Sequence, residues 1–182
     1  MGIRKILLVD DPSLKKRSRE VTNFNKRLHV LLDDMHETLK DASGLGLAAP
    51  QVGILRRVVL IVDFQEGSDC TEERVIELIN PEVLEESGQN IGREGCLSIP
   101  GVYGMIERPE TVRVKAQDRH GTTFELTCKD ITARAIRHEI DHLDGLVLTS
   151  LTDKLFMNED MQVAEGATGT TEATGATEGS ES

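Results

Sequence analysis

Alternation of apolar and polar residues divides the chain into a few predicted elements. In residues 25–41, leucines and a methionine recur at helical spacing among mostly charged residues, which predicts an amphipathic helix with its apolar stripe on the core. His29 and His36 belong to this helix, and we expect both to be solvated at the surface. Residues 43–51 hold two glycines and a proline close together, which predicts that no helix continues through them.

Two short apolar runs predict the first strands. Residues 58–62 are rich in β-branched side chains and are typical of a buried strand. Residues 75–79 form a second run, which we expect to end at Asn80 because a proline follows it. The polar residues 65–73 between the two runs predict a loop, with Cys70 as an exposed thiol.

A β-hairpin is predicted farther along the chain. Residues 111–117 and 124–128 both alternate between apolar and polar positions, the pattern of half-buried strands. Residues 118–121 between them end in a glycine, which is available for a positive φ in a tight turn. We therefore expect Cys128 to be a buried packing residue and His120 to lie in the turn.

A second helix is predicted over residues 131–143, with Asp130 as its N-cap and Gly145 as its C-cap. Its apolar residues cover more than one face, so it should be largely buried. Strands joined mostly by short turns and followed by one late buried helix indicate an α+β fold. We expect antiparallel β-sheets packed around this central helix.

Composition and charge narrow the possible functions. With 182 residues the chain has the length of one domain, and its 3% of aromatic residues predict an aliphatic core. The net charge of -11 argues against nucleic-acid binding by a basic face and against an anionic membrane surface. No apolar run approaches the roughly 18 residues of a membrane helix, and the apolar stretch near the N-terminus is too short for a signal peptide. We therefore expect a cytoplasmic protein without membrane contact.

The C-terminal part of the chain has a different composition. From Glu165 onward it consists of Gly, Ala, Thr, Ser and Glu, which cannot bury enough apolar surface to offset the entropy of ordering. We expect a catalytic domain over residues 1–158 and a disordered, acidic Gly/Thr-rich tail over residues 159–182. The three cysteines do not indicate a disulfide framework, but they leave open a metal-binding or catalytic thiol.

The second predicted helix carries the sequence HEIDH, from His138 to His142. Histidines four positions apart lie on one helix face, so both imidazoles can bind one metal ion. The carboxylate of Glu139, next to the first histidine, can reach a water molecule at that metal without being a ligand. The alternative is a helix with chance histidines, but unpaired histidines in a buried helix are costly.

A catalytic metal typically has three protein ligands and an open position, and the segment after His142 offers no suitable third ligand. Upstream, Cys96 lies beside a glycine in the segment EGCLSIP, and its thiolate would complete a two-His, one-Cys site. The residues alone leave two alternatives open. Cys96 is either a small buried hydrophobe or a nucleophile paired with His138.

Three segments together resemble a known family. GLGLAAPQ at residues 44–51, EGCLS at residues 94–98 and HEIDH at residues 138–142 are similar, in this order, to the three signature motifs of the peptide deformylases. The resemblance covers roughly residues 1–155. It implies a metal-dependent hydrolase that removes the N-terminal formyl group from formyl-Met of newly made polypeptides and releases formate.

The resemblance also implies roles for individual residues. The metal ligands would be Cys96, His138 and His142. The catalytic groups would be the acid/base Glu139, the side chain of Gln51 and the backbone N–H of Leu97, the last two holding the carbonyl oxygen. The residues expected to contact the peptide are Gly46 and Gly95 along its backbone, and Leu45, Ile131, Arg134 and Ala135 around its first side chain.

The cofactor and partners follow from the same comparison of motifs. A thiolate and two imidazoles suit iron(II), zinc, nickel or cobalt, and the resemblance favours one iron(II) ion in the cell. The expected partners are N-formyl-Met nascent polypeptides, with transient proximity to the ribosome. Some family members dock there through a basic C-terminal helix, and the acidic tail argues against that route. Ser43 stands where many members have an acidic residue. Tyr103 stands where some members have an arginine.

Two other functions compete with this interpretation. A zinc endopeptidase uses the same helix motif, but the missing downstream ligand and the EGCLS segment argue against it. A structural metal-binding or peptide-binding module would close its site with a fourth ligand and would not need Glu139.

Overall fold

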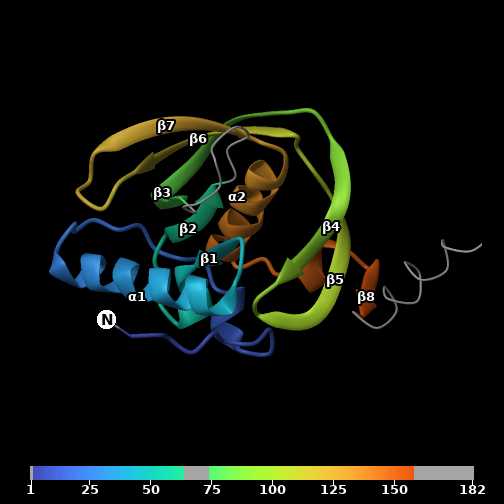
Figure 1. Cartoon of the computed structure of the whole chain (residues 1–182), viewed down its shortest axis with the longest axis horizontal. Coiled ribbons are helices and arrows are strands. Elements are labelled where there is room, and N and C mark those ends of the chain that lie inside the picture. Colours follow the sequence, from blue (N-terminus) through green and yellow to red (C-terminus); the bar gives the residue numbers. More distant parts are fainter. Residues whose placement is uncertain (1, 64–73, 158–182) are drawn as a thin grey trace, which may run out of the picture.

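Two antiparallel β-sheets flank a central helix in the computed structural model, which describes residues 2–63 and 74–157 (Figure 1). Five strands form one sheet in the order β1-β2-β3-β6-β7, and three form the other in the order β4-β5-β8. The helix between the sheets carries HEIDH, which confirms the expected α+β fold. The helical elements are η1 (Pro12–Lys15), α1 (Lys26–Ala42), η2 (Ala49–Val52), α2 (Asp130–Leu143) and α3 (Leu148–Leu151). The strands are β1 (Gly46–Ala48), β2 (Val58–Asp63), β3 (Arg74–Ser87), β4 (Asn90–Cys96), β5 (Ile99–Arg108), β6 (Thr111–Gln117), β7 (Thr123–Lys129) and β8 (Leu155–Met157).

The five-stranded sheet is covered on both faces, which explains the continuous apolar run of β2. Val58 and Leu60 belong to the cluster that includes the apolar stripe of α1. Val59 and Ile61, at the alternate positions, belong to the cluster that includes α2. All four side chains are fully buried, and each such burial contributes about 1.5–3 kcal/mol to folding.

The predicted helices and hairpin are present. α1 begins after Asn25, whose side chain caps the N–H groups of Arg27 and Leu28. β6 and β7 pair in continuous register from Thr111 opposite Lys129, and the turn ends at a glycine with φ +87°. The thiol of Cys128 is half-buried against the α2 side of the core, and burial raises its pKa to about 11.

The predicted end of the second strand is wrong. β3 continues through Asn80 and Pro81 to Ser87 by means of a bulge, where the register with β6 shifts. Asn80 adopts φ +51°, and its side chain bonds both the N–H and the carbonyl of Val21, at 2.8 and 2.9 Å. A bulge is one of the few places where a sheet accepts proline, because no ladder bond requires the missing N–H.

The ends of α2 differ partly from the prediction. Asp130 is not the N-cap, because the helix begins one residue earlier than expected, after Lys129. Asp130 instead takes a left-handed φ of +50°, and its N–H donates to the carbonyl of Glu110 at 2.8 Å. At the other end Gly145 follows the cap residue with φ +79°. Its N–H and that of the next residue bond carbonyls of the last turn, as in a Schellman motif.

The two histidines of α1 were expected to contact only solvent, but each one contacts another element. His36 Nε2 lies 2.9 Å from a carboxylate oxygen of Glu77 on β3, and His29 Nε2 lies 2.8 Å from the carbonyl of Arg119. The Arg119 side chain also bonds Glu77, so these contacts attach α1 to β3 and to the β6–β7 turn. Helical periodicity alone cannot reveal partners that come from other elements.

Two predictions fall outside the described residues: the loop at 65–73 with Cys70, and the tail at 159–182. Within the described residues, no helix is long and apolar enough to cross a membrane.

Candidate metal centre and catalytic site

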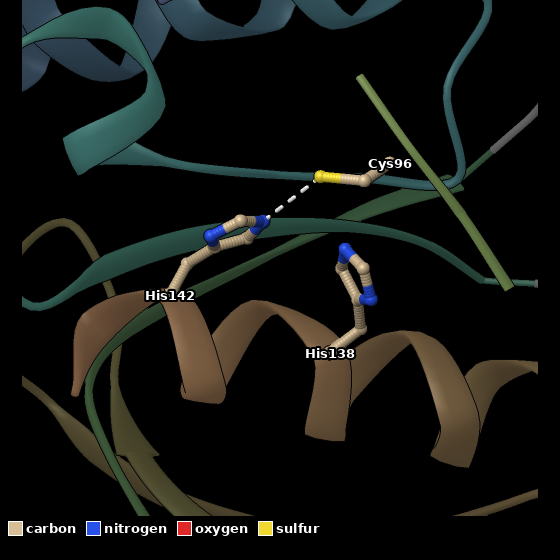
Figure 2. Close-up of side chains that lie close together, drawn as sticks. All are labelled: Cys96, His138 and His142. Carbon is tan, nitrogen blue, oxygen red and sulfur yellow. Dashed lines mark hydrogen bonds between the residues drawn. The ribbon is translucent and has the colours of Figure 1, made fainter. Parts of the chain in front are cut away.

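Three metal-binding side chains converge between the two sheets. His138 and His142 project from one face of α2, and Cys96 lies at the end of β4 (Figure 2). The Cys96 sulfur is 3.2 Å from His142 Nε2, and one ligand atom from each of the three residues lies within 4.8 Å of the others. All three side chains are buried, or nearly so, and point toward a common centre. Thiolate and imidazole donors at this separation fit one divalent transition metal.

Glu94 holds one histidine in the orientation that a ligand needs. Its carboxylate oxygen lies 3.0 Å from His138 Nδ1, which leaves Nε2 of the ring for the centre. Burial raises the pKa of Glu94, but bonds from His138 and Arg108 outweigh it and lower the pKa to about 2. Glu94 is therefore an anion at neutral pH and accepts the Nδ1 proton.

Two arginines surround that buried carboxylate. Arg108 donates to both oxygens of Glu94, at 2.8 and 3.0 Å, and to Asp141 on α2 at 2.6 Å. Arg134 donates to Glu94 at 3.0 Å. These contacts connect β4, β5 and α2 behind the candidate ligands, so the ligand geometry depends on a paired and buried charge network.

The two histidines have opposite electrostatic environments. Burial lowers the pKa of His142 to about 3, so its ring is neutral and its nitrogen lone pair is available. Burial also lowers the pKa of His138, but the bonds with Cys96 and Glu94 outweigh it and raise that pKa well above its usual value. These bonds therefore make His138 the more basic of the two rings.

Glu139 follows the candidate ligand His138 on α2. Its side chain is buried, and Oε2 has no hydrogen-bond partner among the described residues. Burial, the largest effect, raises its pKa to about 7. Gly46 makes room for this carboxylate, because a Cβ atom at Gly46 would lie 2.6 Å from Glu139 Oε1. A buried carboxyl group with one unpartnered oxygen and a pKa near neutrality fits a group that exchanges protons.

Gln51 is oriented by its own turn. Its side-chain carbonyl accepts the N–H of Ala48 at 2.8 Å, so its NH2 group points toward the centre. That NH2 group lies 3.2 Å from Ser98 Oγ and 3.8 Å from the Cys96 sulfur. Leu97, in the turn after Cys96, lies against the first motif, since a Cβ atom at Gly44 would lie 2.8 Å from its side chain.

A cavity of about 590 Å³ is lined by two of the candidate ligands, Cys96 and His138, and by Glu139. Its lining includes every residue for which the sequence predicts a peptide contact, namely Leu45, Gly46, Gly95, Ile131, Arg134 and Ala135. Leu45 and Ile131 expose 42% and 48% of their surface, so apolar area is available to a ligand. A side chain with apolar character therefore fits this cavity next to the centre.

Arg134 differs from the other predicted lining residues because its charged group is bound by other parts of the protein. Its guanidinium bonds the backbone carbonyls of Asn90 at 2.8 Å and Ile106 at 3.0 Å, besides Glu94. Gly92 leaves the space for it, since a Cβ atom there would lie 2.7 Å from Nη2 of Arg134. The charged end of Arg134 thus fastens α2 to β4 and β5, and it forms a wall of the cavity.

Comparison with known proteins shows the family of the chain. The profile described as polypeptide deformylase matches residues 3–156. The peptide deformylase of Caldicellulosiruptor bescii is 46% identical over 89% of this chain and 93% of its own length. The chain belongs to the polypeptide deformylase family. Peptide deformylase 1 of Bacillus subtilis is 42% identical over 91% of this chain and all of its own length.

Solved structures of the family have the same fold. The peptide deformylase from Legionella pneumophila superposes with a TM-score of 0.76 at 36% identity, covering 90% of this chain and 98% of that one. A Met-Ala-Ser-bound class I type b peptide deformylase from Acinetobacter baumannii gives 0.76 at 33% identity, covering 82% and 98%. As a member of the family, the protein is a metal-dependent hydrolase that removes the N-terminal formyl group from newly made polypeptides.

The sequence does not predict the contacts of several residues around the site. Glu94 belongs to the EGCLS motif, but only the structure shows that it bonds His138. Arg108 at the end of β5 and Asp141 on α2 lie 33 residues apart in the sequence, and only the fold brings their side chains together. The sequence of β4 mixes glycine with charged residues, so its pattern did not mark Glu94 as a buried residue that requires partners.

Proposed function

We propose that Cys96, His138 and His142 hold the catalytic divalent metal of this deformylase and that the ion in the cell is iron(II). The observation that carries the proposal is the cluster of three ligand atoms within 4.8 Å of one another, beside Glu139, whose Oε2 has no hydrogen-bond partner among the described residues. Zinc, nickel and cobalt accept the same donor set. The resemblance in the three motifs favours iron among them.

Cys96 acts as a ligand in this proposal and not as a nucleophile. Its sulfur faces His142 Nε2, on the opposite side of the ring from the backbone attachment, as two ligands of one ion would. Chelators should therefore abolish activity, and air should do so when the ion is iron(II), because metal and thiolate both oxidise. A formyl thioester trapped on Cys96 during turnover would contradict this role.

The protein groups supply proton transfer and charge stabilisation. When bound, the metal lowers the pKa of a water molecule toward neutrality. Glu139 takes a proton from the attacking water and passes it to the leaving amine. The NH2 group of Gln51 and the N–H of Leu97 donate to the formyl oxygen as it gains charge, each contributing about 3 kcal/mol to the transition state.

The substrate is a formyl-Met polypeptide bound in extended form. The first side chain enters the cavity beside Ile131 and Ala135, where an unbranched, polarizable side chain such as Met fits. Gly46 and Gly95 leave backbone groups accessible to the peptide. The Met-Ala-Ser peptide bound to the Acinetobacter relative is the kind of product that this reaction would release.

Formate release from formyl-Met-Ala-Ser, measured with metal analysis of protein purified without air, tests the whole assignment. Acetyl-Met-Ala-Ser should react much more slowly, because a methyl group would clash where the formyl hydrogen lies. Casein should remain intact for the same reason. Casein cleavage without deformylation would instead identify an endopeptidase.

The Glu139→Gln variant tests the acid/base role. It should keep stoichiometric metal and lose turnover by about 10²- to 10⁴-fold. Full metal content with wild-type turnover would rule out the role of Glu139.

The remaining proposals concern the cell and the ends of the chain. We place the enzyme in the cytoplasm, where it meets nascent formyl-Met polypeptides and comes transiently close to the ribosome. The catalytic domain spans residues 1–158, and residues 159–182 form an acidic tail without a fixed fold. Such a tail does not provide a basic surface for ribosomal RNA.

A further inference from the structure

The outer face of β4 carries side chains that the proposed chemistry does not use. Along this strand Glu94 and Cys96 are buried on the α2 side, whereas Arg93 and Gly95 are exposed on the opposite face. Tyr103 of β5 stands directly opposite Gly95, and the guanidinium carbon of Arg93 lies 4.9 Å from the centre of its ring. Arg93, Gly95 and Tyr103 all line the cavity that is also lined by Cys96 and His138.

Gly95 fixes the position of the aromatic ring. A Cβ atom at Gly95 would lie 2.9 Å from Cε1 and 3.2 Å from Cδ1 of Tyr103, so any side chain there would displace the ring. The ring therefore lies across β4 one residue before Cys96. Arg93 stacks on it, which holds a positive charge in a defined place at the cavity rim.

The sheet geometry relates this pair to one residue of the substrate. β4 pairs with β5, and its other edge has no strand partner among the described residues. Successive side chains of a peptide added along that edge point to opposite faces. If the first side chain enters the cavity beside Ile131 on α2, the second must project on the face of Arg93 and Tyr103.

We propose that Arg93 and Tyr103 form a subsite for the second residue of the formylated peptide and favour an acidic side chain there. This inference rests on the proposed binding of the peptide along β4. A carboxylate at the second position would pair with the guanidinium, whereas a lysine would meet a like charge. The lining contains four acidic residues. Glu94 and Glu139 are buried on the α2 side, and Glu110 and Asp130 lie near the start of α2, so none of the four shares this face of β4.

The test compares three C-terminally amidated peptides: formyl-Met-Glu-Ser, formyl-Met-Gln-Ser and formyl-Met-Lys-Ser. For the metal-loaded wild type at low salt, kcat/KM should be about 3- to 10-fold higher for Glu than for Lys, with Gln between them. The ratio should fall at high salt, because the pair is exposed and screened.

Variants separate this subsite from the overall charge of the protein. Arg93→Gln should bring the Glu-to-Lys ratio close to one, whereas Arg93→Lys should keep part of it. Tyr103→Ala should lower the ratio and Tyr103→Phe should retain it, because the ring positions the guanidinium. Arg113→Gln removes the same charge from β6, outside the cavity lining, and should leave the wild-type ratio.

The outcomes distinguish this inference from the function itself. A wild-type ratio near one, or an unchanged ratio in Arg93→Gln, overturns the subsite while formate release continues. Absence of formate from all three peptides with metal-loaded wild type would instead contradict the proposed function.

Discussion

Replacing Glu94 by Gln should weaken both the fold and the metal centre, because one carboxylate serves both. The change keeps the size of the side chain and removes its charge. It leaves the guanidinium groups of Arg108 and Arg134 facing an amide that carries its own N–H donors. Glu94 is only 5% exposed, so water cannot compensate for the lost partner.

The expected loss of unfolding free energy follows from the pKa of Glu94. Its fall from 4.5 to about 2, at about 1.4 kcal/mol per pKa unit, corresponds to about 3 kcal/mol in favour of the charged form. A depressed carboxyl pKa stabilises the fold above pH 4.5, and this contribution is lost as the pH falls toward 2. At pH 7 the full contribution is present. The variant should therefore lose about 3 kcal/mol of unfolding free energy.

The effect on the metal has a separate cause. Without the carboxylate, His138 loses the acceptor that fixes its ring and its tautomer. Loss of such a partner typically weakens metal binding by about 10- to 100-fold. The affinity should be measured by competition with a chromophoric chelator, using a metal that resists oxidation.

Urea unfolding of the metal-free protein measures stability without the contribution of bound metal. Glu107→Gln is the matched control, because it removes the same charge from an exposed position on β5 and should change stability by less than about 0.5 kcal/mol. If Glu94→Gln matches this control in both stability and metal affinity, the network does not position His138.

Three further predictions concern other parts of the molecule. Gly46→Ala should reduce turnover while metal content stays near stoichiometric, because the new Cβ would lie 2.6 Å from Glu139 Oε1; kcat and metal analysis test this. Glu77 has its pKa lowered to about 2, with burial outweighed by the bonds from His36 and Arg119, so Glu77→Gln should cost about 1–2 kcal/mol above pH 4.5. The difference from wild type should shrink as the pH falls toward 2, and a pH-independent difference would contradict the pairing. Cutting the chain after Asn158 should leave the melting temperature and small-peptide activity nearly unchanged, and a fall of many degrees would show that the tail packs on the domain.

Periodicity predicted the elements that have one dominant environment. α1 is amphipathic, β2 is buried on both faces, and apolar and polar residues alternate in the β6–β7 hairpin. In each case the order of apolar residues in the sequence follows directly from the surroundings of the element. β4 escaped prediction because its sequence mixes glycine with charged residues. Its buried positions hold Glu94 and Cys96, which the core tolerates through partners on distant elements.

The candidate site was predictable to the extent that its residues stand in motifs. Histidines at helical spacing follow from local geometry, whereas the convergence of Cys96 depends on how β4 packs against α2. The motif resemblance supplied that convergence before the structure did. It did not supply the contacts of Arg108 and Arg134, since neither residue belongs to one of the three motifs.

The N-terminal segment explains how separate motifs are held at one place. The N–H of Leu7 donates to the carbonyl of Gln51 at 2.8 Å, and two residues later the N–H of Val9 donates to the carbonyl of Ser98 at 3.0 Å. One extended segment thereby joins the turn that positions the Gln51 amide to the turn that follows Cys96. Gln51 lies in η2, which follows β1 of the five-stranded sheet, whereas Cys96 ends β4 of the other sheet, so a small relative shift of the sheets would separate them. Bonds from a shared segment oppose that shift, and a misplacement of about 1 Å in such a site can cost about 10²-fold in rate. The segment carries none of the proposed catalytic residues, yet its two bonds join the turns that hold Gln51 and Cys96.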